Sequence, residues 1–566
     1  MHASRIKLWY GFLVVVFAIF LVQLFYLQVI KHDYYVKSAQ KGQLKQYEIP
    51  AERGVIMAKD GKNSVPIVLN EQVYTVYADP EYIKNPNETL SKIQPVIGGD
   101  WNEMLNKIKT DTRYAILAKK IPEDKAKQIE EMKLKGIGVQ AVSQRVYPQG
   151  NMAAQLLGFV NDEGEGKYGI EQSLDKKLKG QPGELKAITD AQGVPLAANK
   201  DNIQHDPVNG ERVTMTIDIS MQRRLEEMLA AHLKEVRSEK GSAIVMDPKT
   251  GEIKAMANYP SYNPSEFYKV EDASLFNNSA VATPLEVGSI MKTLTVAAGI
   301  DSGAVNQNTT YYDPSFYKIG DSVVRNVEED GGAATRSISD ILRYSLNTGA
   351  TYVLMQMGGG KINEKARTTW HDYMVNHYMF GKKTGIEQGY EAEGYVPDPN
   401  KGEGLDITYA NTSFGQGLNI TPLQMLAAFS STINGGVYYR PHLVEASDNA
   451  SNIIKKDVIK PELSAVLRDM HENSVAKNYT FLKRNGYRIG GKTGTAEIPK
   501  PEGGYYNDRF NGTFIGYIGG NQPEYAIMVT TIEPKIGGYA GTRAAAPLFG
   551  KIADMLIGNY AVNKTD

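Results

Sequence analysis

The chain has 566 residues, too many for one hydrophobic core, and this length suggests about three units. Lys and Arg total 63 and Asp and Glu total 64, which gives a net charge of −1. The chain therefore lacks the excess of basic residues that nucleic-acid binding requires, and a nucleic-acid-binding protein is excluded. Hydrophobic residues make up 42% and charged residues 22%, as in folded proteins. The absence of Cys excludes disulfides, zinc–thiolate sites, iron–sulfur clusters and Cys nucleophiles.

The eight His residues do not form a metallopeptidase pattern. His371 and His377 are the closest pair, but a spacing of six residues does not place two imidazoles on one helical face as a spacing of four would. The sequence therefore predicts no metal site.

The N-terminus carries one long apolar segment. From Leu8 to Ile30 the sequence has no charged residue, and a helix of that length crosses a hydrocarbon core about 30 Å thick. A cleavable signal peptide is the alternative, but its apolar stretch would span roughly 7 to 15 residues and end in small residues. This segment ends in Val29 and Ile30 followed by Lys31. We expect a retained single-pass membrane anchor over residues 8–30.

Basic residues on both sides of the anchor bear on its orientation. The more basic flank normally stays in the cytoplasm, and this count would keep the region after the anchor there. The site chemistry described below requires that region to lie outside the cell membrane, and we give the chemistry more weight. The basic residues are Arg5 and Lys7 before the anchor, and Lys31, Lys37, Lys41 and Lys45 after it.

Residues 31–206 show no constellation of catalytic residues. Short apolar runs alternate there with charged stretches, and we expect a separate non-catalytic domain. Arg53-Gly54 and Tyr168–Glu171 stand out, but an Arg paired with a carboxylate for structural reasons explains them as well as an active role does.

From Val213 onward the pattern is that of a mixed α and β domain. An amphipathic helix opens after Asp218, and Asp218 or Ser220 can cap it. Strands at both ends of the region surround a helical middle, which predicts one α+β domain over residues 213–560. The expected strands are 213–217, 242–246 and 252–256 (a hairpin), 514–518 and 525–531, and the last expected helix is 546–557.

A serine hydrolase that does not use His needs another base near its nucleophile. A Lys three residues after a Ser lies one helical turn away, within reach of the hydroxyl. Ser289 and Lys292 have this spacing at the start of an apolar helix, where backbone N–H groups favour a developing anion. The spacing S-x-x-K is weak alone, because it also begins at Ser4, Ser38, Ser173, Ser315 and Ser474.

Two further short motifs follow along the chain. Of three S-x-N matches, Ser345–Asn347 follows an apparent helix and is expected in a loop between helices, whereas Ser447–Asn449 lies in a polar stretch typical of a turn. Of three K-T-G matches, only Lys492–Gly494 is flanked by small residues on an apparent strand, where a ligand can approach the backbone. The other matches begin at Ser261, Lys249 and Lys383.

The segment Gly486–Thr493 also satisfies G-x-x-x-x-G-K-T, the phosphate-binding P-loop pattern. A P-loop leads into a helix whose N-terminus faces phosphate. Gly494 and Pro499 follow here instead, so a P-loop NTPase is only a remote alternative.

The ordered set Ser289, Ser345 and Lys492, together with Gly415-Gln416-Gly417 and Ala545-Ala546-Pro547, resembles the class B penicillin-binding proteins. The resemblance covers nearly the whole chain. It implies a penicillin-recognising serine D,D-transpeptidase domain with an antiparallel sheet flanked by helices, an elongated N-terminal pedestal domain of the dimerisation type, and no glycosyltransferase domain.

The resemblance and the chemistry together assign roles to these residues. Ser289 would attack the carbonyl of the penultimate D-Ala of a stem peptide, with Lys292 as base and Ser345 relaying a proton to the leaving amine. Backbone N–H groups of Ser289 and Thr495 would form the oxyanion hole. No metal or organic cofactor is needed. Asn347 would be the fourth catalytic residue and would hold the acyl-side amide. The substrate-binding residues would be Lys492, Thr493, Gly494 and Thr495, with Lys492, Thr493 and Thr495 on the terminal carboxylate.

The expected partners are peptidoglycan stem peptides, β-lactam antibiotics, and a membrane glycan polymerase with other division or elongation proteins. Gln23 and Gln28 in the anchor are either tolerated helix positions or a contact with such a partner. A penicillin-binding sensor, a non-catalytic scaffold for the polymerase, and a β-lactamase or carboxypeptidase are the alternatives. The sequence is equally compatible with a role in division or in elongation.

Overall fold

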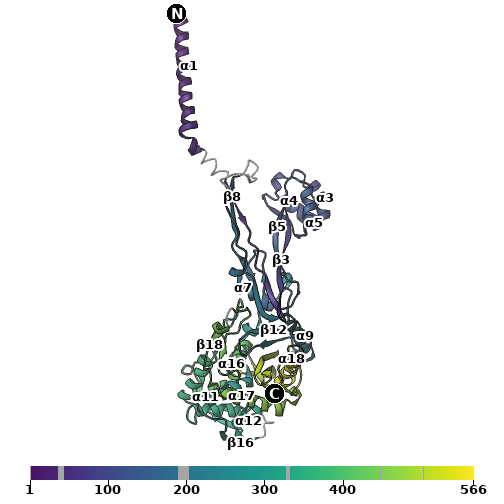
Figure 1. Ribbon diagram of the computed structural model, residues 1–566, viewed down its shortest axis with the longest axis vertical. Coiled ribbons are helices and arrows are strands. Elements are labelled where there is room, and N and C mark those ends of the chain that lie inside the picture. The colour runs from purple at the N-terminus through teal and green to yellow at the C-terminus, as the bar shows by residue number, and fades with distance from the viewer. Residues whose placement is uncertain are drawn as a thin grey trace. The chain divides into compact units, whose positions relative to one another are not determined.

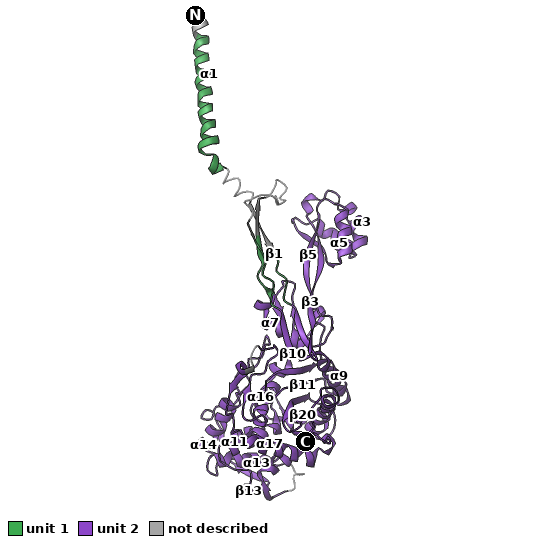
Figure 2. Ribbon diagram, in the orientation of Figure 1, with its two compact units in different colours: residues 1–54, 179–211 green, residues 55–178, 212–566 purple. Residues whose placement is uncertain are grey.

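The computed structural model describes residues 2–35, 44–188, 203–326, 332–446, 449–500 and 503–565 (Figure 1). The chain divides into two compact units (Figure 2). The first consists of Met1–Gly54 and Lys179–Glu211, and the second of Val55–Leu178 and Arg212–Asp566.

The first unit contains the apolar N-terminal helix. Helix α1 (His2–Phe25) continues into the π-helical turn η1 (Tyr26–Ile30). Arg5–Ile30 has a mean hydropathy of 2.6 over its most apolar window, long and apolar enough to cross a membrane. The helix fits a single-pass membrane anchor, as the sequence predicts. The unit also holds an antiparallel sheet of β1 (Leu44–Ile49), β8 (Gly183–Ile188) and β9 (Ile203–His205).

The second unit begins with a five-stranded sheet in the order β10-β2-β3-β4, with β5 also paired to β3. Its longest strand, β3, pairs with β5 over ten residues, and helices α3, α4 and α5 bury their apolar faces in a small core beside these strands. The elements are β2 (Ile56–Asp60), β3 (Asn63–Ala78), β4 (Ala115–Ile121), β5 (Ile137–Val146), β10 (Val213–Asp218), α3 (Pro86–Ile97), α4 (Trp101–Ile108) and α5 (Glu123–Glu131).

The strand predicted at 213–217 is present as β10, and it pairs in parallel with β2. The amphipathic helix predicted after it is α9 (Ile219–Glu235). Asp218 is its cap, because its carboxylate accepts the N–H of Met221 at 2.9 Å. The predicted 213–560 domain thus begins with a strand that completes the preceding sheet.

A second five-stranded sheet, in the order β12-β11-β21-β20-β19, is antiparallel throughout and contains the predicted hairpin and both late strands. Side chains alternate between its faces. Ala243 and Val245 pack with α9 and α18 (Ala546–Asn559), while Ile244 and Met246 face the larger core. The strands are β11 (Lys240–Met246), β12 (Ile253–Tyr259), β19 (Arg488–Pro499), β20 (Tyr505–Gly519) and β21 (Pro523–Ile532).

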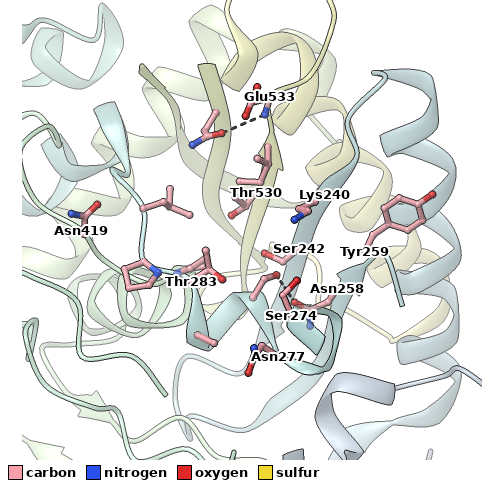
Figure 3. A pocket seen from close by; sticks show the side chains of 18 of the residues that line it. Lys240, Ser242, Asn258, Tyr259, Ser274, Asn277, Thr283, Asn419, Thr530 and Glu533 are labelled. Carbon is pink, nitrogen blue, oxygen red and sulfur yellow. Dashed lines mark hydrogen bonds between the residues drawn. The ribbon is translucent and has the colours of Figure 1, made fainter. Parts of the chain in front are cut away.

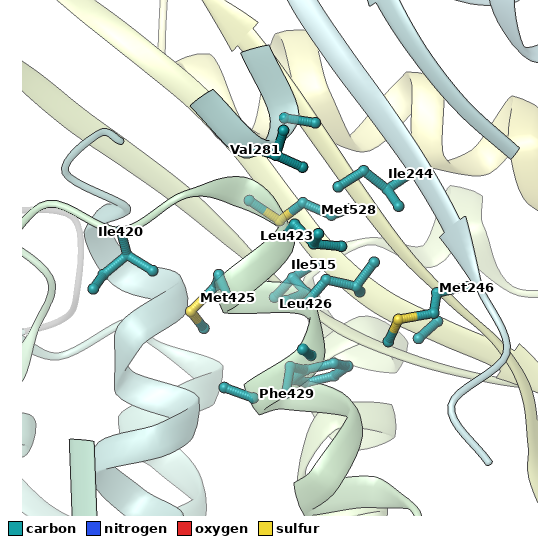
Figure 4. Close-up of a cluster of buried hydrophobic side chains, with 14 of the residues drawn as sticks. Ile244, Met246, Val281, Ile420, Leu423, Met425, Leu426, Phe429, Ile515 and Met528 are labelled. Carbon is teal, nitrogen blue, oxygen red and sulfur yellow. The ribbon is translucent and has the colours of Figure 1, made fainter. Parts of the chain in front are cut away.

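Helix α16 (Pro422–Ile433) is buried along its whole length against that second face (Figure 4). Leu423, Leu426 and Phe429 lie in one core with Ile515 and Met528 of the sheet (Figure 4). The domain is therefore α+β, as predicted, with helices on both sides of an antiparallel sheet. Its other main helices are α11 (Met291–Asp301), α12 (Ile338–Arg343), α13 (Asn347–Met357), α14 (Glu364–Asp372), α15 (Leu405–Ser413) and α17 (Leu463–Asn478).

Candidate active site

Ser289 lies at the entry to a buried helix. It occupies the single 3₁₀ turn η5 (Gly288–Ile290), which runs directly into α11. This is the helix start that the sequence predicts. Every residue of α11 from Met291 to Ile300 is buried, so the position of Ser289 is set by the core beneath it.

Lys292 is fully buried, and its amine lies against Ser289. Its Nζ donates to Ser289 Oγ at 2.9 Å and to Ser345 Oγ at 3.3 Å, and it also bonds the main-chain carbonyl of Ser345. The helical spacing of three residues thus brings the amine of Lys292 to the hydroxyl of Ser289, as expected.

Ser345 lies between α12 and α13, in the predicted loop between helices. Its φ of 59° is in the left-handed region. A residue other than glycine destabilises the folded state by about 1–3 kcal/mol when it adopts this conformation. The conformation places its hydroxyl between two amines, because Lys492 Nζ donates to Ser345 Oγ at 2.9 Å. Ser289, Lys292, Ser345 and Lys492 therefore form one continuous hydrogen-bonded chain.

Strand β19 carries Lys492 and the three residues after it along the site. Lys492 is 1% exposed, and its Nζ also donates to the carbonyl of Thr493 at 3.1 Å. A Cβ added to Gly494 would stand 2.6 Å from the carbonyl oxygen of Val287, two residues before Ser289. Glycine at this position therefore lets the strand approach the segment that leads to Ser289, whereas the sequence predicts the close approach of a ligand.

Two neighbours of β19 are not apparent from the sequence motifs. The hydroxyls of Tyr479 and Thr493 share a hydrogen bond of 2.8 Å, and the N–H of Gly541 donates to Thr495 Oγ1 at 3.0 Å. Both contacts hold the threonine side chains that are predicted to bind substrate. No local pattern identifies Tyr479 or Gly541, because each reaches the strand from another part of the fold.

Asn347 lies two residues after Ser345, as the first residue of α13, and is outside the hydrogen-bonded chain. Its Nδ2 donates to the carbonyl of Arg325, at the end of β15 (Ser322–Arg325), at 2.9 Å. The predicted contact of Asn347 with the acyl-side amide would use the remaining hydrogen-bonding capacity of this side chain.

His471 is fully buried on α17, which packs against β19. Burial, assisted by the charge of Lys492, lowers the pKa of His471 to about 3. This imidazole is therefore neutral near pH 7 and adds no positive charge beside Lys492.

The competing motif matches lie in other environments. Ser474 is buried on α17 and its hydroxyl donates to the carbonyl of Leu342 at 3.3 Å, while Lys249 lies in the turn of the β11–β12 hairpin. The P-loop reading fails, because Lys492 and Thr493 lie inside a strand and not before a helix. Ser38, Ser447 and Asp448 lie outside the described residues.

Comparison with known proteins agrees with this geometry. A family model for the penicillin binding protein transpeptidase domain matches residues 241–554, and one for the penicillin-binding protein dimerisation domain matches residues 48–215. The chain is 29% identical to stage V sporulation protein D of Bacillus subtilis, over 95% of this chain and 83% of that protein. It is 27% identical to peptidoglycan D,D-transpeptidase FtsI of Escherichia coli K12, over 97% and 90%.

Solved structures have the same fold. Penicillin binding protein 2X from Streptococcus thermophilus matches with a TM-score of 0.70 and 22% identity, over 92% of this chain and 83% of that one. Penicillin binding protein 3 from Mycobacterium tuberculosis, complexed with aztreonam, matches with a TM-score of 0.68 and 23% identity, over 92% and 98%. From its motifs, its fold and the family match across its transpeptidase region, the chain belongs to the class B penicillin-binding proteins.

Proposed function

We propose that this protein is a membrane-anchored peptidoglycan D,D-transpeptidase that cross-links stem peptides through an acyl-Ser289 intermediate. The observation that carries the proposal is the hydrogen-bonded chain from Ser289 Oγ through Lys292 Nζ and Ser345 Oγ to Lys492 Nζ. The named activity of the Escherichia coli relative supports the same reaction.

Acylation begins with proton transfer from Ser289 to Lys292. Lys292 must be neutral to accept this proton. The cation Lys492 donates to the same Ser345 hydroxyl as Lys292 does, and a second positive charge there favours the neutral form of Lys292. Oγ of Ser289 then bonds to the carbonyl carbon of the penultimate D-Ala. Backbone N–H groups of Ser289 and Thr495 stabilise the oxyanion. The C–N bond breaks, the proton held by Lys292 passes through the hydroxyl of Ser345 to the leaving amine, and the terminal D-Ala departs.

The strand segment 492–495 binds the donor before that step. A terminal carboxylate is held by the ammonium of Lys492 and by the hydroxyls of Thr493 and Thr495. Gly494 lets this strand lie close to the segment that leads to Ser289, so that the bound carboxylate and the attacking hydroxyl are near each other. Asn347 holds the amide on the acyl side. These contacts place the scissile carbonyl over Ser289, which removes the entropic cost of bringing the two groups together.

The second half-reaction forms the cross-link. The amine of a neighbouring stem peptide attacks the acyl carbon and loses a proton, the ester C–O bond breaks, and that proton returns through Lys292 to Ser289 Oγ. A β-lactam acylates the same oxygen by opening its ring, and its carboxylate takes the place of the donor's terminal carboxylate at Lys492. No metal or organic cofactor enters either step.

We also propose that residues 31–206 and the anchor bind a membrane glycan polymerase, while residues 213–560 cross-link its product outside the cell membrane. Stem peptides are outside, so the catalytic region must be there as well. Gln23 and Gln28 lie within the apolar helix, where a hydrogen bond to a neighbouring helix offsets the cost of burying a polar amide in lipid.

Labelling with a fluorescent penicillin tests the catalytic proposal. Wild type should carry one covalent label, and Ser289→Ala should carry none. Ser315→Ala and Ser474→Ala are matched controls, since each serine also precedes a Lys at the same spacing. Label retained by Ser289→Ala, or lost from either control while folding is unchanged, contradicts the proposal.

Co-purification tests the division of labour. Ser289→Ala should still co-purify with the polymerase, because one hydroxyl at the base of the site contributes nothing to a distant interface.

Protease added to intact cells should degrade the region after Lys31. Loss of the partner in Ser289→Ala, or full protection from protease, contradicts this part of the proposal.

A further inference from the structure

A cavity of about 440 Å³ lies beside the segment that leads to Ser289 (Figure 3). Its walls come from the ends of β11, β12, β19 and β21 and from residues 274–286. Figure 3 shows Thr530 and Thr283 among the side chains that line it. Two buried oxygen atoms on its walls, Glu286 Oε2 and Thr530 Oγ1, have no hydrogen-bond partner among the described residues. Glu286 is the notable one, because it precedes the nucleophile by three residues.

The other oxygen of this carboxylate connects two separate parts of the fold. Glu286 Oε1 accepts the N–H of Gly417 at 2.8 Å and the hydroxyl of Tyr505 at 2.9 Å. Gly417 belongs to the Gly415–Gly417 loop, and Tyr505 is the first residue of β20, opposite Pro499 of β19. One side-chain atom thus ties the nucleophile's segment to that loop and to the β19–β20 hairpin.

The same three segments meet again at the residue before Ser289. Gly288 donates its N–H to the carbonyl of Gly415 at 3.1 Å. A Cβ on Gly288, whose φ is +62°, would stand 2.8 Å from the carbonyl oxygen of Thr495, and a Cβ on Gly415 would stand 2.0 Å from that of Gly288. The three backbones are therefore in direct contact, and a shift of one moves the others.

We propose that Glu286 is a positioning residue for the oxyanion hole, fixing the N–H of Ser289 relative to the N–H of Thr495 through its bonds to Gly417 and Tyr505. This inference rests on the proposed roles of those two N–H groups. Donors of an oxyanion hole act by being held at a set distance from the developing charge. A displacement of about 1 Å in such a site can cost about 100-fold in rate.

Substitutions at Glu286 can separate the effect of its hydrogen bonds from the effect of its charge. Burial raises the pKa of its carboxyl, and the nearby Glu497 adds to the effect. Glu286→Gln keeps a carbonyl oxygen that can accept both hydrogen bonds and removes the charge. Glu286→Ala removes both bonds, and Tyr505→Phe removes one of them. A positioning role predicts that Gln preserves the rate and that Ala and Phe reduce it.

The test measures acylation of the full-length protein in detergent by a fluorescent penicillin over a range of concentrations. The concentration dependence separates the dissociation constant of the non-covalent complex from the limiting acylation rate. Glu286→Ala should lower the limiting rate by about 10- to 100-fold with the dissociation constant within about twofold of wild type. Tyr505→Phe should lower the rate less, and Glu286→Gln should remain within about threefold of wild type.

Glu391→Ala is the matched control for a purely structural effect. Glu391 is also buried, and its carboxylate accepts the N–H groups of Thr384 and Gly385 at 2.7 and 3.0 Å. Its loss should lower the Tm and leave the acylation rate of the folded fraction unchanged.

Three results would overturn the inference: wild-type limiting rates in both Glu286→Ala and Tyr505→Phe, an effect confined to the dissociation constant, or a loss in Glu286→Gln as large as in Glu286→Ala. If Glu286→Ala does not fold, Tyr505→Phe and Glu286→Gln decide the question. An adduct mapped to Ser289 in wild type keeps the proposed function intact whichever way these variants behave.

Discussion

Two groups of buried charged side chains in the second unit differ in their hydrogen-bond partners. Among residues 55–178, the guanidinium of Arg145 donates to the carboxylate of Glu171 at 2.7 Å, with the two side chains 4% and 0% exposed. In the catalytic region, Lys292 and Lys492 are equally buried, and both donate to the hydroxyl of Ser345.

The contrast shows why burial of charge alone does not identify a site. The Arg–carboxylate pair brings opposite charges together in a charge-assisted hydrogen bond, and such a pair orders the structure. In the catalytic region, two like-charged side chains instead share the hydroxyl of Ser345, and Lys292 also donates to the hydroxyl of Ser289, the proposed nucleophile. The predictions below test this distinction.

Replacing the base should have the largest effect. Lys292→Met keeps an unbranched apolar side chain and removes the amine that accepts the proton of Ser289. Because a positioned base contributes about 10²- to 10⁴-fold, the limiting acylation rate with penicillin should fall by that factor. Lys318→Met is the control, since Lys318 has the same spacing from Ser315 and is exposed. An equal rate in the Lys292 variant would remove Lys292 from the mechanism.

Breaking the buried ion pair should affect stability and not chemistry. Glu171→Ala leaves the buried guanidinium of Arg145 without its carboxylate, which should cost about 3–5 kcal/mol of unfolding free energy. The acylation rate of the folded fraction should stay at the wild-type value. Chemical denaturation and penicillin labelling of the same sample measure both quantities. A slower rate with unchanged stability would assign Glu171 a catalytic role and erase the distinction.

The half-buried carboxyl of Glu226 should make stability depend on pH. Burial raises the pKa of Glu226 from 4.5 to about 7, against hydrogen bonds from Gln222 and the N–H of Ala153 that lower it. The folded state then binds more protons than the unfolded state between these values, so the unfolding free energy falls as pH rises from 4.5 to 7.

Glu226→Gln removes this titration and keeps an oxygen that can accept both bonds. Its unfolding free energy relative to wild type should therefore be higher at pH 8 than at pH 5, by up to about 3 kcal/mol. Glu227→Gln, an exposed neighbour on the same helix whose charge is the smallest cause of this shift, should show a much smaller difference. A difference of the opposite sign would mean that the carboxyl is stabilised in its ionised form.

The smallest expected effect concerns substrate anchoring. Lys492→Ala removes a charge-assisted contact worth about 1.5–3 kcal/mol, so acylation efficiency should fall about tenfold to a hundredfold. Lys383→Ala is the matched control, because it begins another K-T-G that lies in a loop.

ATP should not shift the Tm of wild type. A measurable shift would favour phosphate binding at residues 486–493.

Much of the catalytic region follows from local sequence signals. The pairs Ser289–Lys292 and Ser345–Asn347 are short-range and lie where the helix pattern predicts, and the Gly-rich strand around Lys492 is equally local. The anchor follows from length and hydropathy alone. These features depend on neighbours in sequence, which explains why periodicity and spacing are enough.

The remaining contacts depend on the tertiary fold. Glu286 precedes Ser289 by three residues, but its partners Gly417 and Tyr505 come from a distant loop and strand. Likewise, the sequence predicts β10 but not its parallel pairing with β2, far earlier in the chain. Arg145 is not in the segment around Glu171 that stands out in the sequence. Such pairings are set by the packing of whole elements, which no local pattern encodes.

The central claim is that Ser289 alone forms the covalent acyl-enzyme. Intact mass measured after exposure of the full-length protein to penicillin, followed by peptide mapping of the adduct, tests it most directly. The mass should rise by one penicillin, and the adduct should lie on the peptide that contains Ser289 and Lys292. An adduct on Ser315, on Ser474 or on any other residue, or no adduct at all, would contradict the account.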